Sequence, residues 1–330
     1  HAEHGMGLIG DYRRLMRAGI ALARHDVILP GAYQTRLPLP ARIAGRVLRI
    51  FGGGARGRPG ERLARALEKL GPAYIKLGQF LATRPDVFGA EVTQDLGRLK
   101  DKLPPFSMKA ARAALAEEFG EADAARLFAE LSDPVAAASI AQVHKMSLPE
   151  GERAVKILRP GIEHKLMVEL SAMKRAARTI EGISAESQRL KPVAFTETIA
   201  AAMMRETDLR LEAGGADEMH EISHKSGHFV IPSVDWDRTG RRVLTIDWID
   251  GISLTDPKAL DRPGIDRKKL ANDITQGFLT HAIEYGVFHA DMHEGNLIIT
   301  PEGKVALVDF GIIGRIGMVE RRFLAEILWG

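Results

Sequence analysis

Most of the chain has apolar residues at helical spacing, and a smaller part has the short apolar runs typical of strands. The helical pattern covers residues 61–131 and 162–220 and resumes after Gly251. Strands are predicted in "DPVAAASIAQVHKMSL" (133–148), in "RAVKILRP" (153–160), in a hairpin "FVIPSVDWDRTGRRVLTIDWIDG" (229–251) with its turn at 238–240, and in "NLIIT" and "KVALVDF" on either side of a turn at 301–303. The predicted order is a helical part, a small antiparallel sheet with helices inserted, and a second, mainly helical part.

One predicted helix combines apolar and polar features. In "GPAYIKLGQFLATRPD" (71–86) a helix can begin at Pro72 and must end near Arg84, before the next proline. Lys76 and Gln79 are three residues apart and therefore share one face of this otherwise apolar helix. They either form an exposed stripe or are functional groups on a helix that packs as core.

Composition limits both the chemistry and the location. The 330 residues contain no cysteine, which excludes disulfides and thiolate chemistry and fits a reducing compartment. The sequence has no apolar run of about 18 residues or more, and its first residues lack the apolar core of a signal peptide. Neither a membrane span nor a secretion signal is therefore expected within this sequence.

The formal net charge of +3 hides an uneven distribution. Residues 1–66 contain 12 arginines and 4 acidic residues, whereas the remainder contains 34 basic and 39 acidic residues. The segment "YRRLMRAGIALARHDVIL" (12–29) places arginines among apolar residues at roughly helical spacing. It is either a membrane-surface helix or a helix that packs on the rest of the chain. Nucleic acid is not expected as a partner.

Two segments interrupt the pattern near the beginning of the chain, "RLPLP" (36–40) and "FGGGARGRPG" (51–60). The second is typical of a flexible connection. A glycine-rich phosphate loop at Gly52–Gly54 is the alternative, although no apolar strand precedes it. The expected segments are a basic helical N-terminal segment and linker (1–60), a helical extension (61–131), a sheet region with inserted helices (132–250) and a final region (251–330).

Four short motifs carry the candidate chemistry, and the first two come from a strand and a helix. "AVKIL" places Lys156 inside a short apolar strand, where a lysine either reaches the surface or meets an anion. "RETDLRLEA" places Asp208 and Glu212 four residues apart on one helix face. Glu206 points about 120° away from Glu212 around the helix axis. Each of these two motifs also fits an ordinary charged surface.

The other two motifs come from a loop and a strand end. "FHADMHEGNLII" places Asp291 and Asn296 five residues apart in a loop that enters a strand, and in "VALVDFG" Asp309 ends an apolar strand. A carboxylate at the end of a buried strand is costly unless it is paired or bound to a cation. Asn296 and Asp309 offer the oxygen ligands that Mg²⁺ prefers, and Asp291 is suited to orient or deprotonate a hydroxyl or water.

Together the four motifs match the plan of a protein kinase, in which a strand lysine, a helix glutamate, D-x-x-x-x-N and D-F-G handle ATP and its metal ions. The usual glycine-rich loop is absent, and "PVAAASIAQVH" stands in its place. The candidate nucleotide contacts in this loop are Ala136, Ala137, Ala138 and Ser139. The alternative is an ordinary turn of small residues.

These motifs closely resemble the UbiB/ADCK family of atypical kinase-like proteins over roughly residues 61–330. The resemblance rests on the K-x-G-Q helix, the alanine-rich loop, E-T-D, H-A-D followed by G-N, and D-F-G. It implies an α+β, bilobal protein-kinase-like fold. That fold has a small antiparallel-sheet N-lobe (132–250), a helical C-lobe that begins at residue 251 and is truncated in this chain, and a helical N-terminal K-x-G-Q extension.

The resemblance also implies how the site is built. The K-x-G-Q helix is expected to cover the active site, with Lys76 facing Glu206 and Gln79 directed towards the nucleotide. Glu212 is expected to pair with Lys156. The backbone of the hinge at Asp247 and Ile249 is expected to contact adenine. Asp291, Lys156 and Lys76 are thus the catalytic candidates, and Asn296 and Asp309 the metal ligands.

The function implied by the resemblance is a Mg²⁺-dependent atypical kinase or ATPase that binds ATP or ADP and supports ubiquinone (coenzyme Q) biosynthesis. One alternative is a module in which nucleotide switches a lipid- or partner-binding surface with little turnover. A second is a component of 2-polyprenylphenol 6-hydroxylase, although the sequence has no flavin fingerprint or iron-ligand cluster. A third is an ordinary Ser/Thr protein kinase, which the covering K-x-G-Q helix disfavours.

The expected partners follow from this function. They are nucleotide, quinone precursors or lipid, a membrane surface contacted through the basic N-terminus, and other ubiquinone-biosynthesis proteins. Family members continue with further helices and membrane-anchoring segments, so the chain is expected to be part of a longer protein. The expected location is the cytoplasmic side of a bacterial inner membrane.

Overall fold

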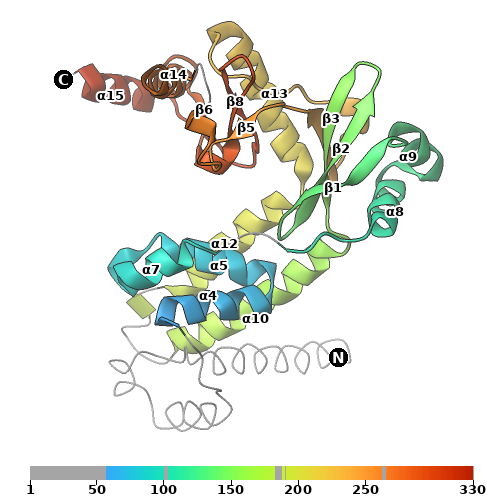
Figure 1. Ribbon diagram of the computed structural model, residues 1–330. Helices are drawn as coiled ribbons and strands as arrows, with labels where there is room; N and C mark the ends of the chain where they lie inside the picture. The colour runs from blue at the N-terminus through green and yellow to red at the C-terminus, as the bar shows by residue number, and fades with distance from the viewer. Residues whose placement is uncertain (1–56, 100–102, 183–187, 190, 262–264, 330) are drawn as a thin grey trace. The chain divides into compact units, whose positions relative to one another are not determined.

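The computed structural model describes residues 57–99, 103–182, 188–189, 191–261 and 265–329 (Figure 1). The expected basic helix and most of the glycine-rich connection lie outside these residues. The chain forms two compact units, each built from separated stretches. Unit 1 comprises His1–Pro104, Ala138–Ile140 and Gly161–Arg205, and unit 2 comprises Pro105–Ala137, Ala141–Pro160 and Glu206–Gly330. Among the described helices, none is long and apolar enough to span a bilayer.

Unit 1 is helical. Its helices are α4 (Pro59–Leu70), α5 (Pro72–Ala82), α6 (Pro85–Phe88), α7 (Ala90–Leu96), α10 (Ile162–Glu181) and α12 (Pro192–Glu206), whose last residue is assigned to unit 2. The predicted K-x-G-Q helix is α5, and it begins at Pro72 as expected. Gly78 in α5 lies against the core, because a Cβ there would be 2.7 Å from Leu67 and 2.3 Å from Leu99.

Unit 2 contains a four-stranded antiparallel sheet with two helices packed on it. Its elements are α8 (Met108–Phe119), α9 (Glu121–Leu127), β1 (Leu131–Ala137), β2 (Ala141–Leu148), β3 (Gly151–Leu158) and β4 (Val243–Asp247), with strand order β1-β2-β3-β4. Val155 and Ile157 are buried in a core that includes Leu115 and Phe128. Because side chains alternate along a strand, Lys156 lies on the opposite face of the sheet.

The rest of unit 2 is mainly helical with short strands. It comprises α13 (Leu209–Ser226), η1 (Trp236–Arg238), β5 (Ile252–Ser253), η2 (Ala259–Asp261), α14 (Arg267–Thr280), the π-helical turn η3 (His281–Tyr285), β6 (Val287–His289), η4 (Glu294–Asn296), β7 (Leu297–Ile299), β8 (Val305–Leu307), β9 (Ile313–Arg315) and α15 (Met318–Trp329). Strands β5, β7 and β8 form one small sheet, and β6 pairs with β9. The strands predicted around the turn at 301–303 are thus present as β7 and β8.

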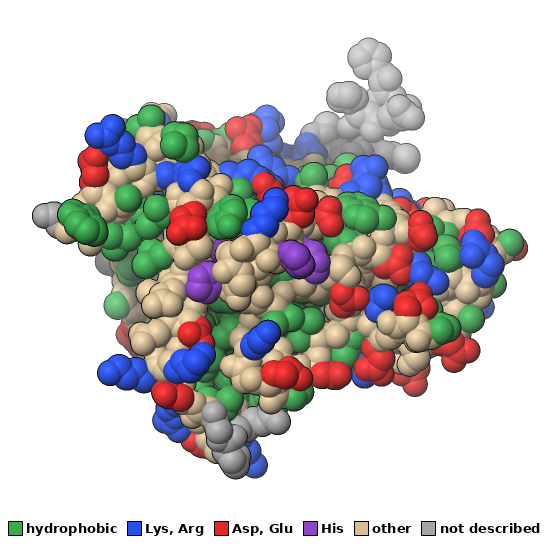
Figure 2. Space-filling model, turned by 90° about the horizontal axis from the view of Figure 1, so that it is seen from above, with side chains coloured by type: hydrophobic (Ala, Val, Ile, Leu, Met, Phe, Trp, Pro, Cys, Tyr) green, Lys and Arg blue, Asp and Glu red, His purple; other side chains and the backbone are tan. Residues whose placement is uncertain are grey.

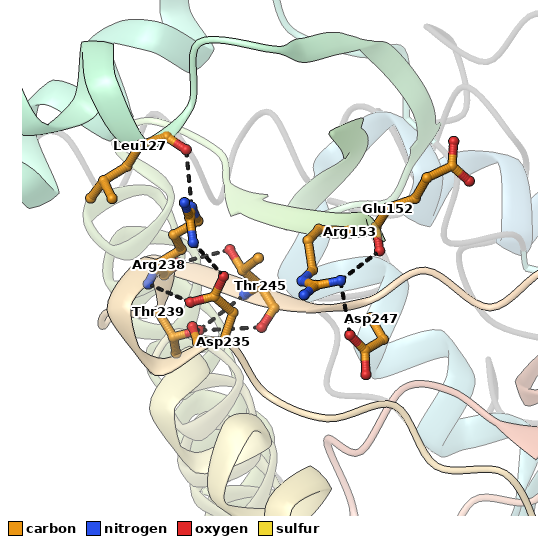
Figure 3. Close-up of polar contacts among 8 residues, drawn as sticks. All are labelled: Leu127, Glu152, Arg153, Asp235, Arg238, Thr239, Thr245 and Asp247. Atoms are coloured by element: carbon orange, nitrogen blue, oxygen red, sulfur yellow. Dashed lines mark hydrogen bonds and ion pairs between the residues drawn. The ribbon is translucent and has the colours of Figure 1, made fainter. Parts of the chain in front are cut away.

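The hairpin predicted for 229–251 forms in part, because the N–H groups of Asp235 and Asp247 donate to the carbonyls of Thr245 and Ser233 across its two arms. Only β4 is a strand, and the first half makes single bridges, from Val230 to Ala306 and from Val234 to Ile246. Pro232 has no N–H to continue a ladder. A turn built by side chains follows, in which Thr239 Oγ1 donates to the carbonyl of Asp235 at 2.7 Å (Figure 3).

Helix α15 presents an apolar side to solvent. Val319, Phe323 and Ile327 are four residues apart and exposed. Exposed hydrophobic side chains are visible among charged ones at the left edge of Figure 2, where α15 lies. The opposite side of the helix is anchored by Arg321, whose Nε donates to the carbonyl of Ile283 at 2.6 Å.

Candidate functional site

Strand β3 and helix α13 bring Lys156 and Glu212 together. The Nζ atom of Lys156 lies 2.9 Å from both Oε1 and Oε2 of Glu212. Asp208 caps α13 by accepting from the N–H of Arg210 at 3.2 Å. The cap places Glu212 in the first turn, on the buried side of the helix. The expected lysine–glutamate pair is therefore present.

The two glycines of α13 differ in their surroundings. A Cβ at Gly215 would lie 2.9 Å from Cγ1 of Ile313 and 3.2 Å from the carbonyl oxygen of Phe310. Glycine at 215 therefore lets α13 pack closely against the D-F-G segment. A Cβ at Gly214 would meet nothing within 4 Å, and the structure does not explain this glycine.

Asp309 lies beside the pair, with Oδ1 at 3.9 Å from Nζ of Lys156. The expectation that it ends a buried strand is wrong, because β8 ends at Leu307 and the Asp309 side chain is 53% exposed. Its backbone is left-handed, with φ of 65°. Such a conformation is uncommon outside glycine and persists where neighbours hold it. Here Oδ1 accepts from the N–H of Gly311 at 3.3 Å.

A buried histidine joins the two acidic motifs. The N–H of Asp291 donates to Nδ1 of His289 at 3.1 Å, so Nε2 carries the proton and donates to the carbonyl oxygen of Asp309 at 2.7 Å. The ring also packs edge-on against Phe310, with centroids 5.7 Å apart. Sequence reasoning used His289 only as part of a motif. The feature of the sequence that could have indicated a structural role for His289 is its position at the end of an apolar run, two residues before Asp291.

The loop between Asp291 and Asn296 is held by its own polar groups. Nδ2 of Asn296 donates to the carbonyl of Asp291 at 3.0 Å, and the N–H of Val308 donates to the carbonyl of Asn296 at 3.0 Å. His293 closes the loop through Nδ1, which accepts from the N–H of Gly295 at 2.9 Å. Asn296 and the D-F-G segment are thereby fixed to each other.

The charges around Lys156 shift the pKa values of the Lys156–Glu212 pair. Burial on its own would lower the pKa of Lys156, but Asp309, Glu212 and Glu206 together raise it above its ordinary value. Burial raises the pKa of Glu212, with Lys156 opposing the rise and Asp309 adding to it. The carboxylates of Asp309, Glu212 and Glu206 thus stabilise the charged form of Lys156.

The donor set fits Mg²⁺. Because Nδ2 of Asn296 is engaged with Asp291, the amide oxygen is the atom suited to a cation, and Asp309 adds a half-exposed carboxylate. The described residues contain no group of three or more His, Asp or Glu side chains arranged to hold a metal. Mg²⁺ does not need such a cage, since it keeps waters and binds through one or two side chains together with substrate phosphates.

The predicted adenine hinge is ordered by contacts of its own. The Asp247 carboxylate accepts from the N–H of Ser233 at 2.9 Å and pairs with Arg153 at 3.1 Å (Figure 3). The N–H groups of Asp247 and Trp248 donate to backbone carbonyls. The Asp247 side chain therefore has a structural role, and adenine contacts by the backbone of Asp247 and Ile249 stay a prediction.

The alanine-rich loop needs no glycine conformation. Among the described residues other than glycine, positive φ occurs at Lys191, Phe229 and Asp309, so Ala136, Ala137, Ala138 and Ser139 all have ordinary backbone angles. Ala136 and Ala137 end β1, in unit 2, and Ala138 and Ser139 belong to unit 1. Lys76 and Gln79, both half-buried on α5, also belong to unit 1. Their contact with nucleotide, and that between Lys76 and Glu206, stay predictions.

Comparison with known proteins bears on this arrangement. Residues 98–330 match the family described as the ABC1 atypical kinase-like domain. The chain belongs to the UbiB/ADCK family of atypical kinase-like proteins. That membership, with the antiparallel sheet and the helices around it, gives this chain an α+β kinase-like fold.

Similar curated proteins include two named "Probable protein kinase UbiB". The one from Marinobacter nauticus is 38% identical over 275 residues, which are 82% of this chain and 50% of that protein. The one from Cellvibrio japonicus is 34% identical over 325 residues, 96% of this chain and 58% of that protein. The "Uncharacterized protein sll0005" of Synechocystis sp. is 36% identical over 271 residues, 80% of this chain and 39% of that protein. The chain thus spans about half the length of these relatives.

A solved structure of Rv3197 in complex with erythromycin, from Mycobacterium tuberculosis, is 28% identical to this chain. It aligns with a TM-score of 0.49 over 76% of this chain and 63% of that one.

Proposed function

We propose that this chain is an atypical kinase or ATPase that binds Mg²⁺ with ATP or ADP and serves ubiquinone biosynthesis. The observation that carries the proposal is the convergence of Lys156, Glu212 and Asp309, with Nζ of Lys156 at 2.9 Å from one carboxylate and 3.9 Å from the other. The link to ubiquinone rests on the resemblance to UbiB proteins and on the names of the relatives.

Each residue has a definite part in this proposal. Glu212 holds the Lys156 ammonium in place, and that charge binds the α- and β-phosphates. Asn296 and Asp309 hold Mg²⁺, which neutralises phosphate charge when bound. Asp291 orients the attacking hydroxyl or water and accepts its proton. Lys76 and Gln79 complete the site by motif, as in the family.

The proposal is tested with Asp309→Asn. This change removes one negative charge from the metal side of the site, so Mg²⁺-dependent binding of a fluorescent ADP analogue should weaken more than about tenfold, and ATP turnover should be lost. Binding is titrated with Mg²⁺ and with EDTA, and turnover is measured with and without a polyprenylphenol precursor.

Asp123→Asn is the matched control, because Asp123 lies in the same unit and forms an exposed ion pair with Arg126 at 2.7 Å. It should bind nucleotide as the wild type does. Equal Mg²⁺-dependent binding and turnover in Asp309→Asn and wild type would refute the metal role of Asp309. No binding by the wild type would refute the proposal as a whole.

A further inference from the structure

Helix α5, which carries Lys76 and Gln79, receives its N-terminal cap from a distant helix. Glu169 lies on α10, and its Oε2 accepts from the N–H of Ala73 at 3.0 Å, although the two residues are 96 positions apart. The residue before α5, Gly71, has no side chain to supply a cap. Both helices belong to unit 1.

The cap completes the hydrogen bonding of the first turn of α5. Pro72 has no N–H. The N–H groups of Tyr74 and Ile75 donate to the carbonyl of Gly71 at 3.1 Å and 3.0 Å. Ala73 is the first-turn donor that these backbone bonds do not serve, and Glu169 accepts from it. The carboxylate also meets the positive end of the helix dipole.

The carboxylate of Glu169 occupies the space that a side chain at position 71 would need. Gly71 has φ of 127°, and a Cβ there would lie 2.3 Å from Oε1 of Glu169 and 2.9 Å from Cδ. Any other residue at 71 would push the carboxylate away from the helix end. The Gly71–Pro72 pair therefore both ends α4 and opens the space that Glu169 occupies.

A packing role alone does not account for a glutamate at position 169. The residue is 8% exposed, and burying a carboxylate costs free energy that an apolar side chain would not cost. Burial raises the pKa of Glu169, and the N–H of Ala73 and the nearby Lys165 oppose that rise. The hydrogen bond from the N–H of Ala73 stabilises the Glu169 carboxylate and offsets part of the cost of burying it.

We propose that Glu169 is a positioning residue that fixes the N-terminal end of α5 and thereby the placement of Lys76 and Gln79. Lys76 is one turn beyond Ala73, so a shift of the first turn moves it directly. The functional half of this inference rests on the proposed function, because it takes Lys76 to act on bound nucleotide.

The test compares Glu169→Ala, Glu169→Gln and the control Glu197→Ala in the full chain. Glu197 lies on α12, in the same unit, and makes an exposed ion pair with Lys174. The first readout is amide hydrogen exchange, without ligand, in a peptide that contains Ala73. Exchange should be roughly tenfold faster in Glu169→Ala, close to wild type in Glu169→Gln, which keeps an oxygen acceptor, and unchanged in Glu197→Ala.

The second readout is Mg²⁺–nucleotide affinity and turnover in Lys76→Ala, Glu169→Ala and the double variant. If Glu169 acts through Lys76, Glu169→Ala should change these values as Lys76→Ala does, and it should add nothing in the Lys76→Ala background. A general loss of stability would instead act in both backgrounds.

The outcomes separate this inference from the proposed function. Unchanged exchange at Ala73 in Glu169→Ala, or additive effects in the double variant, would overturn the role of Glu169 while nucleotide binding in the wild type stands. A wild type that binds no nucleotide removes the proposed function and the functional half of the inference together, and the exchange result still decides whether Glu169 caps α5.

Discussion

Lys156 contacts two carboxylates of the candidate site. Its Nζ contacts Glu212 at 2.9 Å and Asp309 at 3.9 Å, and Glu212 is buried. Removing one partner of a buried ion pair leaves an uncompensated charge, and the cost exceeds the loss of the attraction itself. The residue is thus important for stability as well as for phosphate binding.

Lys156→Met should destabilise the protein by about 3 kcal/mol at neutral pH. Burial and Asp309 already raise the pKa of Glu212, and without Lys156 that pKa rises further. A carboxyl group whose pKa is higher in the folded than in the unfolded state favours folding at low pH, and this advantage is lost as pH rises through the folded pKa. The deficit relative to wild type should therefore grow from pH 5 to pH 8 in urea unfolding.

Lys145→Met provides the comparison, because Lys145 pairs with the more exposed Glu152 at 2.6 Å. Exposed pairs contribute about 0–1 kcal/mol, so this variant should lose little stability. A Lys156→Met deficit that is the same at both pH values would show that Glu212 does not remain buried and ionised without its partner.

At the scale of an element, α13 decides how the glutamate and the D-F-G segment meet. It begins at the Asp208 cap, carries Glu212 one turn in, and passes the D-F-G segment at Gly215. The two neighbouring glycines offer a matched pair, since they share one helix but differ in what a methyl group would contact.

Gly214→Ala should stabilise the protein by about 0.5–1 kcal/mol, because it replaces glycine in an exposed helix interior with no clash. Gly215→Ala should destabilise it by about 1–3 kcal/mol, because its Cβ would press on Ile313 and Phe310. Urea unfolding measures both, and nucleotide affinity should fall only in Gly215→Ala. Equal stability changes in the two variants would contradict the close packing seen at Gly215.

Local signals in the sequence predicted the elements that depend on local chemistry. Pro72 marked the start of α5, and the turn at 301–303 separated β7 from β8. The first arm of the hairpin is irregular, because Pro232 lacks an N–H and the side-chain hydrogen bond from Thr239 to the Asp235 carbonyl overrides a run of β-formers. Strands β6 and β9, of three residues each, pair only because the tertiary fold brings them together.

Some features of the candidate site could also be predicted from the sequence, and others could not. The convergence of Lys156, Glu212 and Asp309 was expected because their motifs resemble those of kinase-like proteins, in which these positions meet at one site. The bridge by His289 and the contact at Gly215 depend on how separate elements pack, which spacing does not encode. The cap by Glu169 also escaped sequence reasoning, since its partner Ala73 is 96 residues away.

At the scale of the whole molecule, both compact units are assembled from stretches that alternate along the chain. The helices that pack with α5 include α10, which follows the sheet strands in sequence. Neither unit therefore corresponds to a continuous fragment of the chain, so a truncation inside the described residues would remove part of at least one unit. Arg58 binds the buried Asp95, so the first described residues already belong to the packed structure.

The uneven charge gives a prediction for the whole chain. We propose that the basic N-terminal region contacts anionic membrane. Residues 1–56 contain 9 arginines and 3 acidic residues, so deleting them changes the formal net charge from +3 to −3 and leaves Arg58 in place. Each basic residue near an anionic surface contributes about 1 kcal/mol, screened by salt.

The full chain should therefore co-sediment with vesicles that contain anionic phospholipid and should dissociate as salt is raised. The chain that begins at residue 57 should stay in the supernatant, because a net negative protein is repelled by the same surface. Neutral phosphatidylcholine vesicles are the control and should retain neither form. Equal binding of both forms to anionic vesicles would assign the membrane contact to residues 57–330 instead.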